Sequence, residues 1–369
     1  MRIAVDAREL LRQPTGVGRY LAELCAEWAR LPADAPHRFE LYAHLPGDTP
    51  GVLGHRFDDL PARFTYRGIG GAGDTWWEQH HFARALGDEP PDVLFAPAYT
   101  APLRTQVPVV LTVHDISFET RPEWFGWREG LRRRWLTRQS VARASRIISV
   151  SGFTRDELVR HFRVPAERVR VVWSGVPHGA RSTGDHRDRE PLVLFVGSIF
   201  NRRHIPELIQ AFAQVASDHP GAELVLVGSN RTHPPQAPVR LAERAGVADR
   251  VLVRDYVEEA ELQSLYARAS VFAFLSEYEG FGLPPLEAMA AGIPVVVGDT
   301  PVARELYGEA AWRVPVDDVG AIGNAPAPLL ADPDARQRAV DAAGALLPRF
   351  TWARAAAETL QVLEEAVGG

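Results

Sequence analysis

Two carboxylates stand eight positions apart in the stretch SEYEGFGLPPLEAMAAGIPV, at residues 276–295. Glu279 precedes a loop with two glycines and two prolines, and Glu287 follows it. Pro284 and Pro285 suit the first turn of a helix, because the N–H that proline lacks has no partner there. The free N–H groups at such a helix start attract phosphate. Carboxylates accept hydrogen bonds from sugar hydroxyls. The segment therefore combines features that recognise phosphate with features that recognise sugar, as a sugar nucleotide requires.

Two further groups follow strand patterns in the first half of the chain. His114 and Asp115 come directly after an apolar run, and Gly16 and Gly18 separate a strand pattern from a helix pattern. The carboxyl ends of parallel strands are where α/β folds bind ligands. Glycines before a helix allow the backbone to approach an anion closely. An ordinary turn and a structural histidine are the alternative interpretations of these residues.

The elements that must position these groups alternate between strand and helix along almost the whole chain, which predicts an α/β fold with parallel sheets and helices on both faces. The polar stretch RSTGDHRDRE, at 181–190, predicts a linker between two domains. We expect Rossmann-like domains at 1–180 and 191–348 and a C-terminal helical segment at 349–369. The predicted strands are 2–6, 39–43, 93–96, 109–113, 146–150 and 169–173, then 192–196, 223–227, 251–253, 271–275 and 295–297. The predicted helices include 18–30, 127–144, 206–216, 258–269 and 352–367.

Composition narrows the function classes. The length of 369 residues suits two α/β domains. The net charge of −6 argues against a nucleic-acid-binding protein. No apolar run is long enough to span a membrane, and Met1 leads directly into a strand, so we expect a cytoplasmic protein without a signal peptide. Cys25, the single cysteine, is expected to be a reduced core residue. All 41 basic residues are arginines, so a site that uses lysine elsewhere must use arginine here.

The segment 279–296 resembles the E-x7-E signature of retaining glycosyltransferases of the GT-B architecture, in particular family 4. The resemblance rests on the carboxylate pair, the EGFGLP loop and the following G-x-P-V-V segment at 292–296. The TGVGRY loop resembles that of members linked to mannosyl donors. The resemblance implies two Rossmann-like domains whose sheets face across a cleft, with the nucleotide sugar bound by the second domain. It also implies that the C-terminal helix at 349–369 crosses back to the first domain. It implies transfer of a hexosyl group, with mannose favoured, from a nucleoside diphosphate sugar to an acceptor hydroxyl with retained configuration. The implied donor is GDP-mannose or a UDP-sugar, with no cofactor.

The resemblance also assigns roles to residues. It implies that Glu279 and His114 orient the transferred sugar, that Arg203 grips the diphosphate and that Glu287 holds the ribose. Arg203 stands where the family commonly has lysine, and Asn201 stands where it commonly has proline. The other residues that are expected to line the substrate site are Gly16, Gly18, Asp115, Ser198, Arg202, Val257, Gly280, Phe281, Gly282 and Leu283.

No metal site is expected. The triplet Asp332–Pro333–Asp334 has the letters of a D-x-D motif, but it precedes a helix pattern and is expected to cap that helix. Ser151 is expected near another helix N-cap. Two other functions stay open. A carboxylate pair can serve a glycoside hydrolase or a phosphorylase-like enzyme as acid and nucleophile, and the chain could also be a non-catalytic sugar-nucleotide-binding protein.

The acceptor is the least determined partner, and a carbohydrate, a lipid-linked molecule and a small molecule all remain open. The first domain is expected to bind it. Trp76, Trp77, Tyr99 and Trp124 could stack on an acceptor ring, with core packing as the alternative. The segment WREGLRRRWLTRQSVAR at 127–143 predicts a basic amphipathic helix, which suits peripheral contact with the inner membrane face. A solvated helix face is the alternative.

Overall fold

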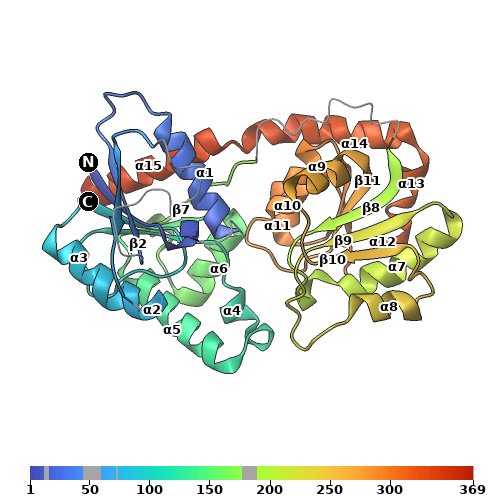
Figure 1. Ribbon diagram of the computed structural model, residues 1–369, viewed down its shortest axis with the longest axis horizontal. Helices are drawn as coiled ribbons and strands as arrows, with labels where there is room; N and C mark the ends of the chain where they lie inside the picture. Colours follow the sequence, from blue (N-terminus) through green and yellow to red (C-terminus); the bar gives the residue numbers. More distant parts are fainter. Residues whose placement is uncertain (12–15, 45–59, 72–73, 177–188, 369) are drawn as a thin grey trace. The chain divides into compact units, whose positions relative to one another are not determined.

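The computed structural model describes residues 1–11, 16–44, 60–71, 74–176 and 189–368. The chain divides into two compact units, traced in Figure 1. The first unit comprises Met1–Gly175 with Trp352–Gly369, and the second comprises Val176–Thr351. The predicted linker at 181–190 lies outside the described residues except for Arg189 and Glu190, and Glu190 is already the first residue of a strand.

The first unit is built on a seven-stranded sheet with the order β3-β2-β1-β4-β5-β6-β7. Every neighbouring pair is parallel. The central strands are apolar and buried along their whole length, because helices cover both faces of a parallel sheet. The strands are β1 Arg2–Asp6, β2 Arg38–Ala43, β3 Phe64–Gly68, β4 Val93–Ala96, β5 Val109–Val113, β6 Arg146–Ser149 and β7 Val169–Val171. The α-helices are α1 Val17–Ala29, α2 Asp74–Trp76, α3 Ala83–Asp88, α4 Ser117–Thr120, α5 Trp127–Arg143, α6 Gly152–Phe162 and α15 Trp352–Gly368, and a π-helical segment, η4, spans Trp77–Phe82.

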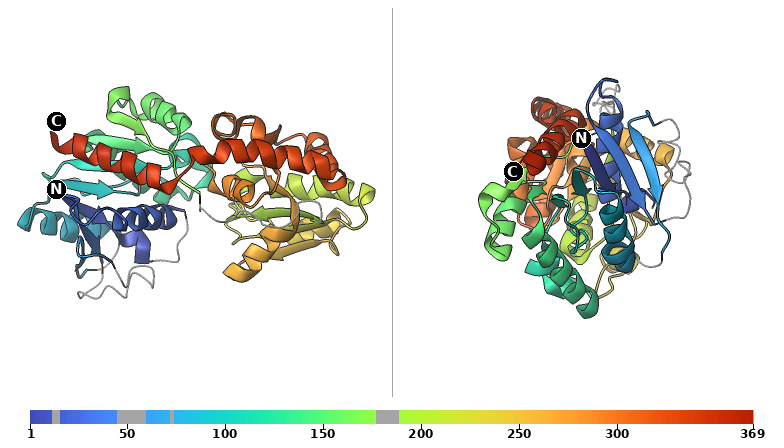
Figure 2. Two further views of the ribbon diagram at one scale, coloured as in Figure 1. Left: turned by 90° about the horizontal axis from the view of Figure 1, so that it is seen from above. Right: turned by 90° about the vertical axis from the view of Figure 1, so that its left-hand side faces the viewer.

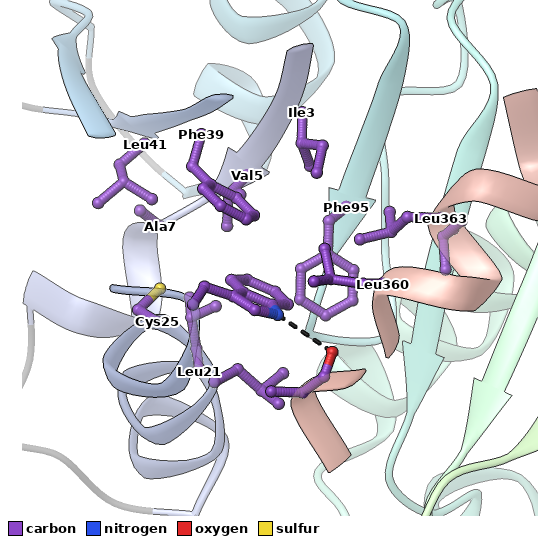
Figure 3. Packing of buried hydrophobic residues seen from close by; sticks show 14 of the residues in the cluster. Ile3, Val5, Ala7, Leu21, Cys25, Phe39, Leu41, Phe95, Leu360 and Leu363 are labelled. Carbon is purple, nitrogen blue, oxygen red and sulfur yellow. Dashed lines mark hydrogen bonds between the residues drawn. The ribbon is translucent and has the colours of Figure 1, made fainter. Parts of the chain in front are cut away.

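The C-terminal helix α15 belongs to the first unit, where it packs on α1 and on the central strands (Figure 2). The fully buried Trp28 lies at this contact, and its indole Nε1 donates a 3.1 Å hydrogen bond to the carbonyl oxygen of Ala356, drawn in Figure 3. Its ring stacks on Phe39 at 4.8 Å. Cys25 is buried in the same cluster, and burial raises the pKa of its thiol to about 12. Cys25 is therefore a core residue with a free thiol, as predicted, and its raised pKa keeps that thiol protonated.

The second unit repeats the design with a six-stranded sheet of order β10-β9-β8-β11-β12-β13, again parallel throughout. The order reverses between β8 and β11, which makes this pair the topological switch point where such folds bind ligands. The strands are β8 Glu190–Val196, β9 Glu223–Val227, β10 Val251–Arg254, β11 Ala269–Phe274, β12 Val295–Gly298 and β13 Ala311–Val314. The α-helices are α7 Ile205–Asp218, α8 Pro238–Arg244, α9 Glu259–Arg268, α10 Leu283–Ala290, α11 Pro301–Leu306, α12 Val319–Asn324, α13 Ala327–Ala331 and α14 Pro333–Leu346.

The predicted α/β class with two parallel sheets is confirmed, and two strands were missed. Strand β3 pairs only with β2 at the sheet edge, and its sequence FTYRG is partly exposed and ends in arginine and glycine. Strand β13 is also an edge strand, with four residues, AWRV, and an arginine inside it. An edge strand has a neighbouring strand on one side only and is less buried than a central strand. The sequences of β3 and β13 therefore lack the continuous apolar run of the central strands.

Candidate functional site

The switch point of the second unit brings together two loops that are far apart in the sequence. After β8 the chain turns at Gly197, forms the short helix η8, Asn201–Arg203, and enters α7. After β11 it runs through Ser276 to Glu279. The backbone N–H of Glu277 donates to the carbonyl oxygen of Arg202 at 2.9 Å and so joins the two loops. The adjacency of β8 and β11 therefore positions residues that are separated by more than 70 positions.

Arg203 and Glu279 form an ion pair at this junction. The Arg203 Nη2 and Nε groups donate to Glu279 Oε1 at 3.1 and 3.3 Å. The hydroxyl of Ser276 donates to the same oxygen at 2.8 Å. Among the residues that the structure describes, these bonds all fall on Oε1, so Glu279 Oε2 is the oxygen that can accept a hydrogen bond from a ligand hydroxyl.

Arg203 is held in a buried slot, with an exposed fraction of 8%. Its Nη1 donates to the carbonyl oxygen of Ser198 at 2.8 Å, and its guanidinium lies 4.7 Å from the ring centroid of Phe274. A Cβ at Gly197 would collide with that Nη1 group, so the slot requires glycine. Burial lowers the pKa of Arg203, and the Glu279 carboxylate opposes this. A guanidinium has five N–H donors, and three serve these protein bonds, so two remain for an anion.

The glycine loop that follows Glu279 leads into α10 as the sequence predicts. Gly282 is the N-cap, in the left-handed region with φ of 84°, and Pro284 and Pro285 lie in the first turn. The two prolines remove two N–H groups, so the donors at this end are those of Leu283 and of the loop before it. A buried tyrosine, Tyr307, supports the loop, because its hydroxyl donates to the carbonyl oxygen of Gly282 at 2.8 Å.

The remaining predicted residues of the second unit lie in the loops and helices that follow β8, β10 and β11. Glu287 is half-buried on α10, and Val257 is buried between β10 and α9. Arg202 is half-buried, with its guanidinium 4.4 Å from the ring centroid of Phe200. Ser198 is half-buried, while Gly280 and Phe281 are buried. Their assigned contacts with a donor stay predictions.

Asn201 has a structural task at the position where the family commonly has proline. Its Oδ1 accepts a hydrogen bond from the backbone N–H of His233 at 2.6 Å, and its Nδ2 donates to the carbonyl oxygen of Pro234 at 3.1 Å. These two bonds tie η8 to the loop that follows β9. In this chain the side-chain bonds of Asn201 therefore help to hold the turn at η8.

In the first unit, His114 lies at the carboxyl end of β5. Its Nε2 is 2.8 Å from the carbonyl oxygen of Pro97, which can only accept, so Nε2 carries a hydrogen. Burial lowers the pKa of His114, although the bond to Pro97 and the charge of Asp115 act in the other direction. The imidazole is therefore neutral near pH 7, and its Nδ1 is a hydrogen-bond acceptor.

Asp115 is engaged within its own loop. Its Oδ1 accepts from the backbone N–H and the hydroxyl of Ser117, at 2.8 and 2.6 Å, and its Oδ2 accepts from the hydroxyl of Tyr99 at 3.2 Å. These contacts order the turn that carries His114, and a contact between Asp115 and a substrate stays a prediction. Ser151 is the N-cap of α6, as predicted, and accepts from the N–H of Thr154 at 3.1 Å.

The two glycines before α1 differ in what they require. Gly16 is the N-cap residue with φ of 43°, a conformation that favours glycine. A Cβ on Gly18 would lie 2.6 Å from the carbonyl oxygen of Glu9, so Gly18 allows α1 to pack on the segment before it. Residues 12–15 of the loop lie outside the described part of the chain.

Sequence reasoning missed a buried charge cluster at the end of β1. Arg8 Nη2 lies 2.6 Å from Asp6 Oδ2 and 2.6 Å from Glu78 Oε1, and Thr100 donates to the same Glu78 oxygen at 2.7 Å. The exposed fractions of Asp6 and Glu78 are 4% and 1%. Burial raises the pKa of Glu78 despite the opposing charge of Arg8. The position of Asp6 at a strand end was a usable signal, whereas the π-helical segment that brings in Glu78 had none.

The aromatic candidates divide between core and surface. Trp77 is fully buried and stacks on Phe82 at 5.0 Å, so it is a core residue. Tyr99 and Trp124 are half-buried. Trp76 is exposed over 58% of its surface.

Within the described ranges, no group of three or more His, Cys, Asp or Glu side chains is placed to hold a metal ion. Asp332 caps α14, because its Oδ1 accepts from the N–H of Asp334 at 2.8 Å, as predicted. Nor does any helix of the described residues have the length and hydrophobicity to cross a membrane.

Both halves of the chain match family models. Residues 14–179 match the model described as Glycosyltransferase Family 4, and residues 180–345 match the model described as Glycosyl transferases group 1. The chain is 28% identical over 294 residues to O-antigen chain mannosyltransferase B of Escherichia coli, covering 75% of each chain. It is 30% identical over 208 residues to O-antigen chain mannosyltransferase RfbU of Salmonella typhimurium, covering 56% of this chain and 57% of that one. The structure of HepE from Anabaena in complex with UDP-glucose superposes with a TM-score of 0.76 at 18% identity, over 98% of this chain and 99% of that one.

Proposed function

The chain belongs to glycosyltransferase family 4, with the GT-B fold, and we propose that it transfers a hexosyl group from a nucleoside diphosphate sugar to an acceptor hydroxyl with retained anomeric configuration. Mannose is the favoured sugar, because two of its relatives are mannosyltransferases by name. GDP-mannose and UDP-sugars are the donors to test. No metal ion and no cofactor take part in the proposed reaction.

The observation that carries this proposal is the Arg203–Glu279 pair at the switch point of the second unit. Arg203 keeps two N–H donors for a diphosphate, and Glu279 keeps Oε2 for a sugar hydroxyl. The two groups are bonded to each other, so a ligand that uses both must carry an anion next to a polyol. A nucleoside diphosphate sugar has this chemistry. The HepE structure, which contains UDP-glucose, supports a nucleotide donor for this fold.

The proposed step breaks the bond between the sugar C1 and the diphosphate oxygen, and the electron pair leaves with the diphosphate. The acceptor oxygen forms the new bond to C1, and its proton passes to the departing phosphate oxygen. Negative charge grows on the diphosphate during this step, and the fixed donors of Arg203 and of the Gly280–Leu283 backbone stabilise it. Glu287 is proposed to accept from the ribose hydroxyls.

In the proposed mechanism, the first unit contributes the acceptor site and His114. The neutral His114 presents Nδ1 as an acceptor, so it would orient a hydroxyl of the transferred sugar and would not act as an acid. Gly16 and Gly18 are proposed to let the α1 loop approach the diphosphate. The single buried, protonated cysteine is in keeping with a cytoplasmic enzyme.

A donor screen tests the proposal. The full chain is incubated with GDP-mannose, UDP-glucose and other nucleoside diphosphate sugars, with and without candidate acceptors, and release of nucleoside diphosphate is measured. Slow donor hydrolysis that an acceptor accelerates would support a transferase. Cleavage of simple glycosides would instead indicate a hydrolase, and binding without any turnover would indicate a sugar-nucleotide-binding protein. The Glu279→Gln variant is the matched control for turnover at this site, because glutamine keeps the shape of the Glu279 side chain and removes its charge.

A further inference from the structure

Helix α5 of the first unit presents a row of large apolar side chains to solvent. Trp127, Leu131 and Trp135 are exposed over 69%, 53% and 57% of their surfaces. They are four residues apart, so they form one stripe along the helix. Trp76 on α2 is exposed over 58%. Single exposed hydrophobic residues need no explanation, whereas four large ones gathered on one side of a unit indicate a binding surface.

The stripe is not needed for packing within the unit. The buried residues of α5 are Gly130, Leu136, Thr137, Ser140 and Val141. They lie on another side of the helix and attach it to its own domain. Helix α5 therefore has one apolar side that packs on the first unit and a second that its own unit leaves uncovered.

Positive charge is concentrated on the same helix. Residues 127–143 contain six arginines and one glutamate, a net charge of +5, in a chain whose net charge is −6. Arg133 points to the rings of Tyr99 and Phe118, and Arg138 pairs with Glu119 at 2.6 Å. Arg128 and Arg132 lie exposed between the tryptophans.

A pocket of about 440 Å³ opens between α2 and α5. Trp76 and Trp135 contribute to its walls together with the exposed Arg104. Trp76 stacks on His80 with a centroid distance of 3.6 Å, and Arg132 Nη1 donates to the Thr75 hydroxyl at 3.1 Å. These contacts connect α2 with α5, so the exposed tryptophans, the arginines and the pocket form one surface. We call it the Trp–Arg face, defined by Trp76, Arg104, Trp127, Arg128, Leu131, Arg132 and Trp135.

We propose that the Trp–Arg face docks on the surface of an anionic bilayer. Tryptophan rings prefer the headgroup level of a membrane, where their apolar body and their N–H group are both satisfied. Arginines beside them attract anionic lipid phosphates, and the amphipathic helix then lies in the plane of the interface. The pocket has the size of a small-molecule site and takes one lipid headgroup. The overall negative charge of the chain would repel such a bilayer, so binding depends on this local excess of arginine.

Vesicle co-sedimentation tests the proposal without any need for enzymatic activity. The full chain is mixed with vesicles of phosphatidylcholine alone or of phosphatidylcholine with phosphatidylglycerol. We expect the chain to pellet with the second kind only, with a blue shift of its tryptophan fluorescence, and to be released by salt. The Arg128→Gln/Arg132→Gln variant should bind about 25-fold more weakly, at about fivefold per arginine.

Two further variants complete the design. Trp127→Ala/Leu131→Ala/Trp135→Ala should lose vesicle binding, and an unchanged thermal unfolding midpoint shows that it folds. Val239→Ser/Arg240→Gln changes an exposed apolar residue and an exposed arginine on α8 of the second unit, and it should bind like the wild type. Three outcomes overturn the proposal: wild-type chain that stays in solution with anionic vesicles, equal binding to neutral vesicles, or a dimer in sedimentation velocity that the triple variant abolishes.

Discussion

Replacing Arg203 with lysine tests whether the planar guanidinium holds the site in the second unit. Arg203 donates two bonds to Glu279 and one to the carbonyl oxygen of Ser198 from three different nitrogens. Lysine has all its donors on one atom, so Arg203→Lys can keep one of the two partners and loses about two charged bonds. At about 1.5–3 kcal/mol for a bond to a charged group, partly recovered by relaxation, we expect a loss of about 2–4 kcal/mol from the stability of the second unit.

The assay must separate the two units, because a two-domain protein has no single free energy of unfolding. Hydrogen exchange read by mass spectrometry reports on peptides from β8 and β11 and, independently, on peptides of the first unit. We expect faster exchange in the second unit only, and a 10- to 100-fold lower kcat/KM for donor consumption, which is about 1.4–2.7 kcal/mol of transition-state stabilisation. The exposed Arg240 on α8 provides the matched control Arg240→Lys, which should change neither quantity.

A double-mutant cycle tests whether the effect of Arg203→Lys depends on the contact with Glu279. Arg203→Lys, Glu279→Gln and the double variant should give a coupling free energy of about 0.5–3 kcal/mol, the range for side chains in direct contact. Exchange rates and kcat/KM of Arg203→Lys within twofold of the wild type would refute the reasoning. The ammonium group of lysine would then serve as well as the planar guanidinium of arginine. A coupling near zero would refute the pairing itself.

Three other perturbations follow from the same geometry. The pKa of His114 in the folded protein is depressed below its ordinary value of 6.5. Its stabilising contribution is therefore complete above pH 6.5 and is lost as the pH falls towards the folded pKa. The free energy of unfolding, measured against pH, should fall more steeply in acid for the wild type than for His114→Gln, by at most about 1.4 kcal/mol per pH unit. Tyr307→Phe removes the hydroxyl that supports the carbonyl oxygen of Gly282, and it should cost about 1–3 kcal/mol of stability and raise the KM for the donor more than it lowers kcat; unchanged donor affinity would contradict a supporting role. Activity in excess chelator should equal activity without it, and a loss that magnesium restores would contradict the metal-free mechanism.

The α/β class, the central strands and the main helices could be predicted from the sequence, because central strands of a parallel sheet and amphipathic helices have strong periodic patterns. It also located the helix start at Pro284 and Pro285, where the local chemistry of proline decides the structure. It did not predict the bonds between Arg203 and Glu279. These residues are separated by 76 positions, and only the adjacency of β8 and β11 brings them together. The support of Gly282 by Tyr307 escaped prediction for the same reason.

A comparison of the clusters around Arg8 and Arg203 explains why we propose phosphate binding for the second unit. Arg8 faces two carboxylates, Asp6 and Glu78, so the cluster carries no positive excess when both are ionised, and burial favours the neutral form of Glu78. An anion placed there would meet carboxylates. Arg203 faces one carboxylate, Glu279, so that pair is neutral, with donors remaining on the guanidinium and an acceptor remaining on the carboxylate. A neutral, buried pair with both kinds of hydrogen-bonding capacity left can bind a phosphate and a hydroxyl at once, whereas an arginine shared by two carboxylates can only hold its own loops in place.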